Sequence, residues 1–383
     1  MTITTQHETF CNNPNISALV NAQLEDDSRY HPNLGGVTRG GMANHYPMTV
    51  TAMQAMGASD EQVVRFIKSW PRQRALIDDH LHLEDNHELN DGNWVNYLGQ
   101  ANKLREFRRV FLSQLAEQSQ QQVISSALTR MQFGLPMGLF HPLIRLSFAQ
   151  MHGDNGLIAD ALAYMAIRYF NLYPGYQATH QDSNAIDMTA REVWRSISQQ
   201  FASQGVSTML PNFPAGGSLS ICERLCGDSK VHRLVTADGF SVIADNLNKR
   251  VIQLCQSAVQ LYLYEPSLTT LHAVTACQAL ADLTRSTHDT GLESKVAADL
   301  WQLMWVWLTA LYIEKGFPTE LTEVNDVSEE LLSAPSWQQL FDRALDTQEV
   351  HVMKMAFSCK WLYDEIDANP LYRLAVAKML GIA

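Results

Sequence analysis

Helical periodicity is the feature of this sequence that most constrains its fold. Apolar residues recur every three or four positions over long stretches. No Asp-Gly or Asn-Gly turn stands between two alternating apolar runs, the usual signature of a β-hairpin. The pattern therefore predicts an all-α protein, a large single-domain helical bundle. The clearest stretches are 63–67, 100–130, 156–170 and 246–264.

Local signals mark where several of these helices begin and end. Ser59-Asp-Glu-Gln62 has the form of a capping box, and Pro71 ends the helix that follows it. Thr347 is the predicted cap of a helix that runs through Tyr363 and stops before Pro370. Glycine, proline, asparagine and aspartate cluster in the expected loops, which are 31–41, 78–91, 173–187 and 210–217.

No stretch has the length or composition of a flexible linker between domains. We therefore expect an N-terminal arm over residues 1–32 and a single helical domain over residues 33–383. The hydrophobic fraction of 46% in 383 residues is sufficient for a sizeable core.

Charge and composition exclude several classes of function. The 28 basic and 40 acidic residues give a net charge of −12, which repels phosphate backbones and anionic membrane surfaces. The most apolar run, Leu300–Ile313, is too short to span a bilayer, so it predicts a buried core helix. Six scattered cysteines lack a disulfide pattern, and no signal peptide is recognised. We expect a cytoplasmic protein that binds neither nucleic acid nor membranes.

Thirteen histidines are present, and four of them stand beside or within apolar helical sequence. These are His45, His141, His272 and His351. A neutral imidazole is a good ligand for iron, zinc, copper or nickel, and metal sites in helical bundles form where helices face one another. Spacing alone leaves two interpretations open for each residue, a metal ligand or an ordinary core histidine.

Lys354 is a second candidate ligand on the same helix as His351. Residues three apart share a helix face, so the two side chains point to the same side. The sequence around the pair is apolar. A lysine buried there has a lowered pKa, and its neutral amine can react with carbon dioxide to give a carbamate, an oxygen ligand. The alternative is that Lys354 reaches solvent or pairs with a carboxylate.

The sequence around these histidines resembles the questin oxidase-like family. Each motif is short, but all occur in the expected order over roughly residues 33–360. The segments that carry the resemblance are Asn44–Ser59, Phe140–Leu146 with Ala161–Ala163, Leu271–Thr275, and His351–Lys354.

The resemblance implies a helical oxidoreductase that acts on aromatic polyketides such as anthraquinones. It implies a mononuclear non-haem iron, Fe(2+), and in at least one branch a carboxylated lysine. The ligands carried over by position are His45, His141, His272 and His351, and Lys354 matches the lysine. The expected partners are a small apolar or aromatic substrate and dioxygen, in a hydroxylation, a ring cleavage or a Baeyer–Villiger-type insertion.

This sequence departs from the family pattern at Arg145 and Met151, where many fungal members have a histidine and an acidic residue. The departure concerns the substrate and the reaction more than the metal. Arg145 stands one helical turn after His141. It is our candidate catalytic residue, either binding an anionic group of the substrate or pairing with a carboxylate of the bundle.

Two other functions remain open at this level. The bundle could be a metal-free carrier or sensor of an aromatic ligand. His288-Asp289 could instead belong to a metal-dependent phosphohydrolase, although its polar surroundings are typical of a chance loop. The polar run Asp78–Glu88, with three histidines, resembles a metal site by composition but is typical of a solvated loop.

The need for a reductant is a further open question, because some members of the family use a nicotinamide cofactor. The chain has no Gly-x-Gly-x-x-Gly after a strand, so NADPH would bind weakly or through a partner protein. The sequence leaves open whether the protein forms a homodimer.

Overall fold

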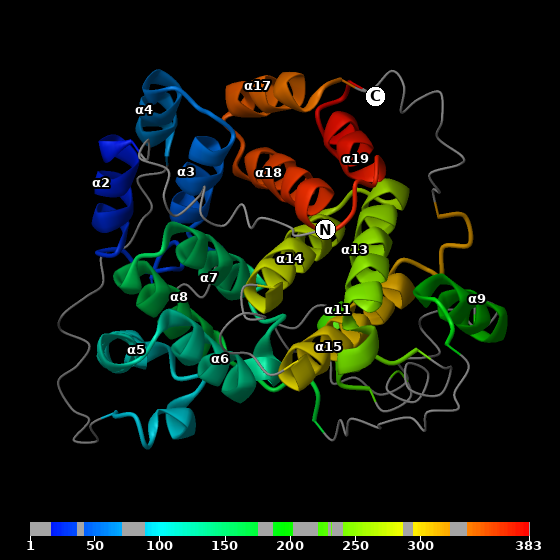
Figure 1. Ribbon diagram of the computed structural model, residues 1–383, viewed down its shortest axis with the longest axis horizontal. Coiled ribbons are helices and arrows are strands. Elements are labelled where there is room, and N and C mark those ends of the chain that lie inside the picture. The colour runs from blue at the N-terminus through cyan, green and yellow to red at the C-terminus, as the bar shows by residue number, and fades with distance from the viewer. Residues whose placement is uncertain are drawn as a thin grey trace. The chain divides into compact units, whose positions relative to one another are not determined.

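The computed structural model describes residues 17–36, 42–70, 89–174, 187–201, 221–228, 231, 240–285, 294–321 and 335–382. Helices make up the regular structure of these residues (Figure 1). The only β pairing among them is an isolated bridge between Asn33 and Ala43. The prediction of an all-α protein is confirmed. The run Asp78–Glu88 and the pair His288-Asp289 lie outside the described residues.

The chain divides into two compact units. The first comprises Met1–Phe170 with Gln338–Phe357, and the second comprises Asn171–Trp337 with Ser358–Ala383. One helix, α18 (Val350–Glu365), contributes its first turns to the first unit and the rest to the second. The expectation of a single domain over residues 33–383 stays a prediction.

In the first unit, α7 (His141–His152) lies between α3 (Tyr46–Ala55) and α8 (Asn155–Arg168) (Figure 1). Helix α2 (Ala18–Asp27) packs on α3, although the sequence places it in an N-terminal arm. Helix α8 also contacts α5 and α6. The remaining elements of this unit are α4 (Asp60–Ser69), η3 (Trp94–Tyr97), η4 (Ala101–Lys103), α5 (Leu104–Glu117), α6 (Gln120–Met131), η5 (Gln132–Gly134) and all but the first residue of α17 (Trp337–Thr347).

The second unit is built around α13 (Leu247–Tyr264), which contacts several other α-helices. These are α9 (Ala190–Phe201), α14 (Leu268–Arg285), α15 (Ser294–Glu314) and α19 (Leu371–Met379). The unit also contains α11 (Ile221–Cys226) and η6 (Ala244–Asn246).

Helix α15 is the buried core helix that the sequence predicts. Among the described helices it alone is long and apolar enough to cross a membrane, but 83% of its most apolar window is buried inside the structure. Its Trp305 and Tyr312 both stack on Trp194 of α9, with ring centroids 5.8 and 4.6 Å apart. This aromatic packing is typical of a buried core helix.

The helix boundaries follow the local signals in most places. Ser59 and Gln62 form the predicted capping box at the start of α4. The stretch 100–130 is divided between two α-helices: α5 ends at Glu117, the backbone of Gln118 is extended, and Ser119 starts α6 with a second capping box to Gln122. The expected cap at Thr347 is wrong: Thr347 is the last residue of α17, and α18 begins after Glu349.

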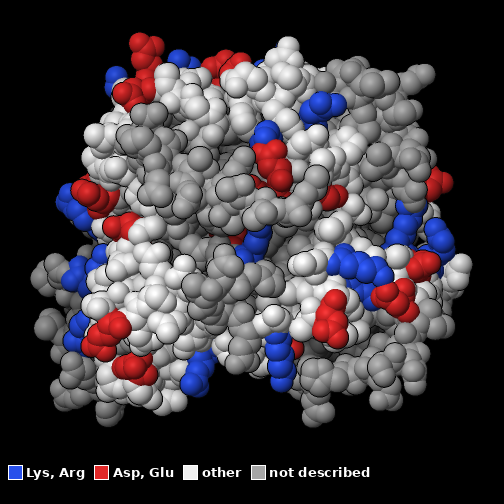
Figure 2. Space-filling model, viewed as in Figure 1, with Lys and Arg blue, Asp and Glu red and all other residues white. Residues whose placement is uncertain are grey.

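Charged side chains of both signs are interspersed over the face shown in Figure 2. Neither sign forms a large patch among the described residues of that face.

Candidate metal centre

Three of the four predicted histidines meet in the first unit. His45 caps the start of α3, His141 is the first residue of α7, and His351 is the second residue of α18. One ring nitrogen from each can be chosen so that all three lie within 4.8 Å of one another. The ring centroid of His45 lies 4.6 Å from that of His141 and 4.7 Å from that of His351. We call these residues the histidine cluster. Such a spacing suits three ligands of one metal ion.

A left-handed turn orients the ring of His141. Gly138, Leu139 and Phe140 have φ values of 63°, 53° and 60°. This conformation is unfavourable for Leu139 and Phe140, at a cost on the order of 1–3 kcal/mol for each residue, so the surrounding packing must impose it. The turn brings the Gly138 carbonyl oxygen to 2.6 Å from Nδ1 of His141. Because a carbonyl oxygen only accepts, Nδ1 carries the proton and Nε2 keeps its lone pair for a metal.

The start of α18 orients His351 in a similar way. Gln348 has a φ of 55°, and the next residue, Glu349, turns its carboxylate onto the helix start. Glu349 Oε2 accepts the backbone N–H groups of His351 and Val352 at 2.7 and 3.1 Å. Glu349 Oε1 lies 3.2 Å from Nδ1 of His351. A carboxylate that accepts from Nδ1–H leaves Nε2 as the free ligand atom, as in many metal-binding histidines.

Lys354 lies one turn further along α18 and is fully buried. Its ammonium nitrogen forms no hydrogen bond with any described residue. Burial lowers the pKa of Lys354 to about 7, and the negative charge of Glu349 opposes this shift only in part. The alternative in which Lys354 reaches solvent or pairs with a carboxylate therefore does not describe this structure.

The surroundings of His141 keep its imidazole neutral. Burial and the nearby charge of Lys354 lower the pKa of His141 to about 3. His45 and His141 are each 7% exposed. A neutral imidazole is the form that binds a metal.

Arg145 is buried and paired with a carboxylate, the second of its two predicted roles. Its Nη2 lies 3.0 Å from Oδ2 of Asp27, and both side chains are buried. Nη1 is also buried and has no hydrogen-bond partner in the described part of the chain. Contact between this second nitrogen and an anionic substrate group stays a prediction.

His272 belongs to the second unit, on α14. It is buried, and its Nδ1 lies 2.7 Å from the carbonyl oxygen of Leu268. The same argument as for His141 leaves Nε2 of His272 as the available ligand atom. Its membership of a ligand set with the histidine cluster stays a prediction.

Sequence reasoning missed two residues that hold the site. Glu349 could have been found, because a carboxylate at a helix start two residues before a candidate ligand is a readable signal. Asp27 carried no signal, since its partner Arg145 is distant in the sequence and their pairing depends on the fold.

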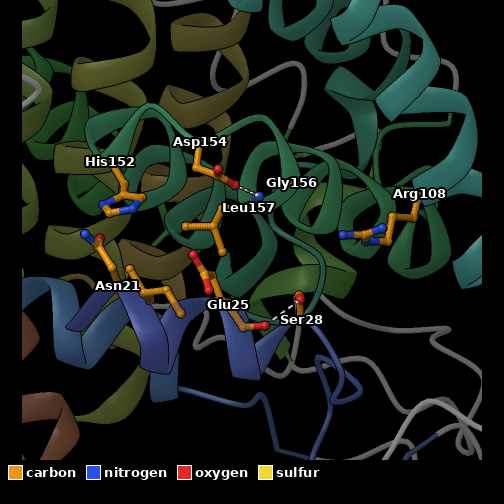
Figure 3. A pocket seen from close by; sticks show the side chains of 9 residues that line it. Asn21, Glu25, Ser28, Arg108, His152, Asp154, Gly156 and Leu157 are labelled. Atoms are coloured by element: carbon orange, nitrogen blue, oxygen red, sulfur yellow. Dashed lines mark hydrogen bonds between the residues drawn. The ribbon is translucent and has the colours of Figure 1, made fainter. Parts of the chain in front are cut away.

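A pocket of about 430 Å³ lies at the other end of α7 (Figure 3). His152 closes that helix, so about 16 Å of helix separates it from His141. In Figure 3, Asn21, Glu25 and Ser28 of the α2 region face His152 and Asp154 across Leu157. Charges of both signs line this pocket, and it is separate from the histidine cluster.

The fold and the site describe an all-α protein in which three histidines from separate helix starts lie close together, two of them buried. A sequence model of the questin oxidase-like family matches residues 42–359, which include all four predicted histidines and Lys354. The chain therefore belongs to the questin oxidase-like family, and this membership indicates an oxidoreductase. Among curated proteins, none matches the chain.

Proposed function

We propose that this protein is a non-haem iron-dependent oxygenase that acts on an apolar, aromatic, polyketide-like substrate. The observation that carries the proposal is the histidine cluster, whose ligand atoms lie within 4.8 Å of one another on three helix starts. The family name supports an oxidation, and the nitrogen donors suit iron(II).

His45, His141 and His351 would hold the metal, with His272 as a proposed fourth ligand. Iron(II) bound by nitrogen and oxygen ligands with open positions supplies activation of dioxygen. The contribution of the chain is to fix the ligand nitrogens before the metal arrives. The Gly138 carbonyl and the Glu349 carboxylate do this by holding Nδ1 of His141 and His351.

Lys354 would join the site as a carbamate. A buried ammonium near the cluster would repel a metal cation, and nothing in the described structure neutralises it by a hydrogen bond. In the reaction, the neutral amine attacks the carbon of carbon dioxide, a nitrogen–carbon bond forms, and the amine nitrogen releases a proton. The product has an anionic oxygen donor in place of a cation, which removes the electrostatic conflict.

Apolar side chains beside the cluster suit an aromatic substrate and exclude water. Phe140 directly precedes His141 and is 1% exposed. Phe148 and Phe357 also pack together in this unit, with ring centroids 5.0 Å apart. A water-poor site strengthens electrostatic interactions with a phenolate or enolate oxygen of the substrate.

The test is metal analysis of protein prepared without a nickel resin, together with three variants. We expect near-stoichiometric iron in the wild type and in His152→Ala, which removes a histidine from the far end of α7. We expect little or no iron in His141→Ala and His351→Ala. Oxygen uptake with a hydroxylated anthraquinone should follow the same order.

Absence of metal from the wild type, even after anaerobic addition of iron(II), would contradict the proposal. Tight binding of an aromatic ligand by that metal-free protein would then favour a carrier or sensor. Need for NADPH is tested in the same assay, by comparing oxygen uptake with and without it.

A further inference from the structure

Asp27 is a fully buried carboxylate to which sequence reasoning assigns no role. It is the last residue of α2 and is 0% exposed. Its Oδ1 accepts a hydrogen bond from Nδ2 of Asn44 at 2.8 Å, and its Oδ2 accepts one from Nη2 of Arg145 at 3.0 Å. One carboxylate therefore links two segments that are distant in the sequence.

The position of Asp27 is poor for the stability of its own helix. A carboxylate at a helix C-terminus interacts unfavourably with the helix dipole. Burial of an aspartate–arginine pair also carries a desolvation cost that apolar residues of similar volume would avoid. These two costs indicate that the pair serves the arrangement of other groups.

The two partners of Asp27 stand directly beside the histidine cluster. Asn44 precedes His45, and its side-chain oxygen also accepts the backbone N–H of Tyr46 at 3.1 Å, at the first residue of α3. Arg145 follows His141 by one turn of α7 and shares its side of the helix. The carboxylate therefore ties the start of α3 to the first turn of α7, where the rings of His45 and His141 lie 4.6 Å apart.

We propose that Asp27 is a positioning residue that sets the separation of His45 and His141 through Asn44 and Arg145. The proposal rests on the proposed metal site, because it concerns how that site is kept ready for its ion. Side chains that hold metal ligands in place act in this way, and their loss weakens metal binding without removing a ligand.

The chain offers a matched control in Asp160. This aspartate is also buried and pairs with Arg108, in a pair that joins α8 to α5. The charge of Arg145 acts on Asp160 through space, but Asp160 forms no hydrogen bond with Asn44 or Arg145 among the described residues. Asp27→Asn and Asp160→Asn each neutralise one buried carboxylate with little change in size. Only the first should alter the histidine cluster.

The experiment measures cobalt(II) affinity by chelator competition and records the cobalt absorption spectrum, for the wild type and both variants. Urea unfolding of the metal-free proteins measures the loss of stability in each variant. We expect Asp27→Asn to bind cobalt roughly 10- to 100-fold more weakly, with a changed spectrum. Asp160→Asn should keep the wild-type affinity and spectrum.

Wild-type cobalt affinity in Asp27→Asn would overturn the role of Asp27 and leave the metal site intact. Failure of the wild type to bind cobalt at all would overturn the metal site and this role with it. If Asp27→Asn does not fold, Asn44→Ala removes the contact to Oδ1 of Asp27, together with the bond from the Tyr46 N–H, and leaves the Arg145 contact in place. It should show the same weaker affinity, and wild-type affinity in it would overturn the proposal.

Discussion

His31 is a buried imidazole outside the histidine cluster. It is 3% exposed, and its Nδ1 accepts the backbone N–H of Asn33 at 3.0 Å. Burial, with the positive charges of Arg145 and Arg168, lowers the pKa of His31 from 6.5 to about 4. Folding therefore holds this residue neutral at a pH where the unfolded chain binds a proton.

The stability of the protein should consequently fall as the medium becomes acidic. The contribution of neutral His31 is fully present above pH 6.5 and is lost as the pH falls through about 4. The shift corresponds to at most ~3 kcal/mol of unfolding free energy. We expect urea unfolding to show a smaller loss between pH 7 and pH 4 in His31→Gln than in the wild type, at equal metal content. Equal losses in the two proteins would contradict the prediction.

Lys354 shows how much of a single residue's surroundings could be predicted from the sequence. Its apolar neighbours indicated burial, with contact to solvent or to a carboxylate as the alternative, and it is buried. The sequence did not predict that its nitrogen would lack a hydrogen-bond acceptor among the described residues, because that depends on which groups face it in the fold. Arg145 is the opposite case, since its buried partner Asp27 comes from another helix.

At the level of elements, the three histidines of the cluster all stand at helix starts. The positive end of the helix dipole lies at each of these starts. The same dipole disfavours a metal cation, so a site built from three helix starts benefits from an anionic ligand. The Lys354 carbamate would provide that charge, and Glu349 already supplies one behind His351.

Glu349 has two roles that substitution should separate. Its carboxylate caps the start of α18, and it also holds Nδ1 of His351. Glu349→Gln keeps an oxygen that accepts the N–H groups of α18. It loses the negative charge that faces Nδ1 of the His351 imidazole. Glu349→Ala loses both. We expect metal affinity, measured by chelator competition, to fall roughly 10- to 100-fold in Glu349→Ala and by an intermediate amount in Glu349→Gln. Unchanged affinity in Glu349→Ala would show that this carboxylate serves the helix alone.

Element boundaries were predictable where one side chain satisfies backbone groups a few residues away. The capping box at Ser59 is of this kind. The break at Ser119 has the same chemistry, and a Ser-x-x-Gln pattern marks it, although helix-forming residues on both sides hide it. The turn before α18 was misread because threonine is the better cap by type, whereas Thr347 ends α17 and the Glu349 carboxylate accepts the first N–H groups of α18.

At the scale of the whole molecule, metal binding should stabilise the folded protein. A ligand that binds only the folded state adds about 4 kcal/mol at a concentration 1,000 times its dissociation constant. We expect the melting temperature to rise with iron(II) under anaerobic conditions and to fall back when a chelator is added. His152→Ala should behave like the wild type, whereas a comparable rise in His141→Ala would place the stabilising ion elsewhere.

The sequence by itself determined the helical class and the identity of the candidate ligands. Both properties depend on short stretches of sequence. Periodicity sets which face of a helix is buried. Short segments around each histidine carry the family resemblance. It also determined the burial of α15, because a long apolar stretch leaves few positions for solvent contact. For Lys354 it left burial and contact with solvent both open, and the structure decided for burial.

Only the tertiary structure decided which residues meet. The approach of His45, His141 and His351 to within 4.8 Å depends on how three helix starts pack, and no single segment encodes it. The left-handed turn before His141 persists only because surrounding contacts impose it on Leu139 and Phe140. The carboxylate of Asp27 likewise acquires its partners from two other segments, since long-range pairing follows from packing rather than from spacing along the chain.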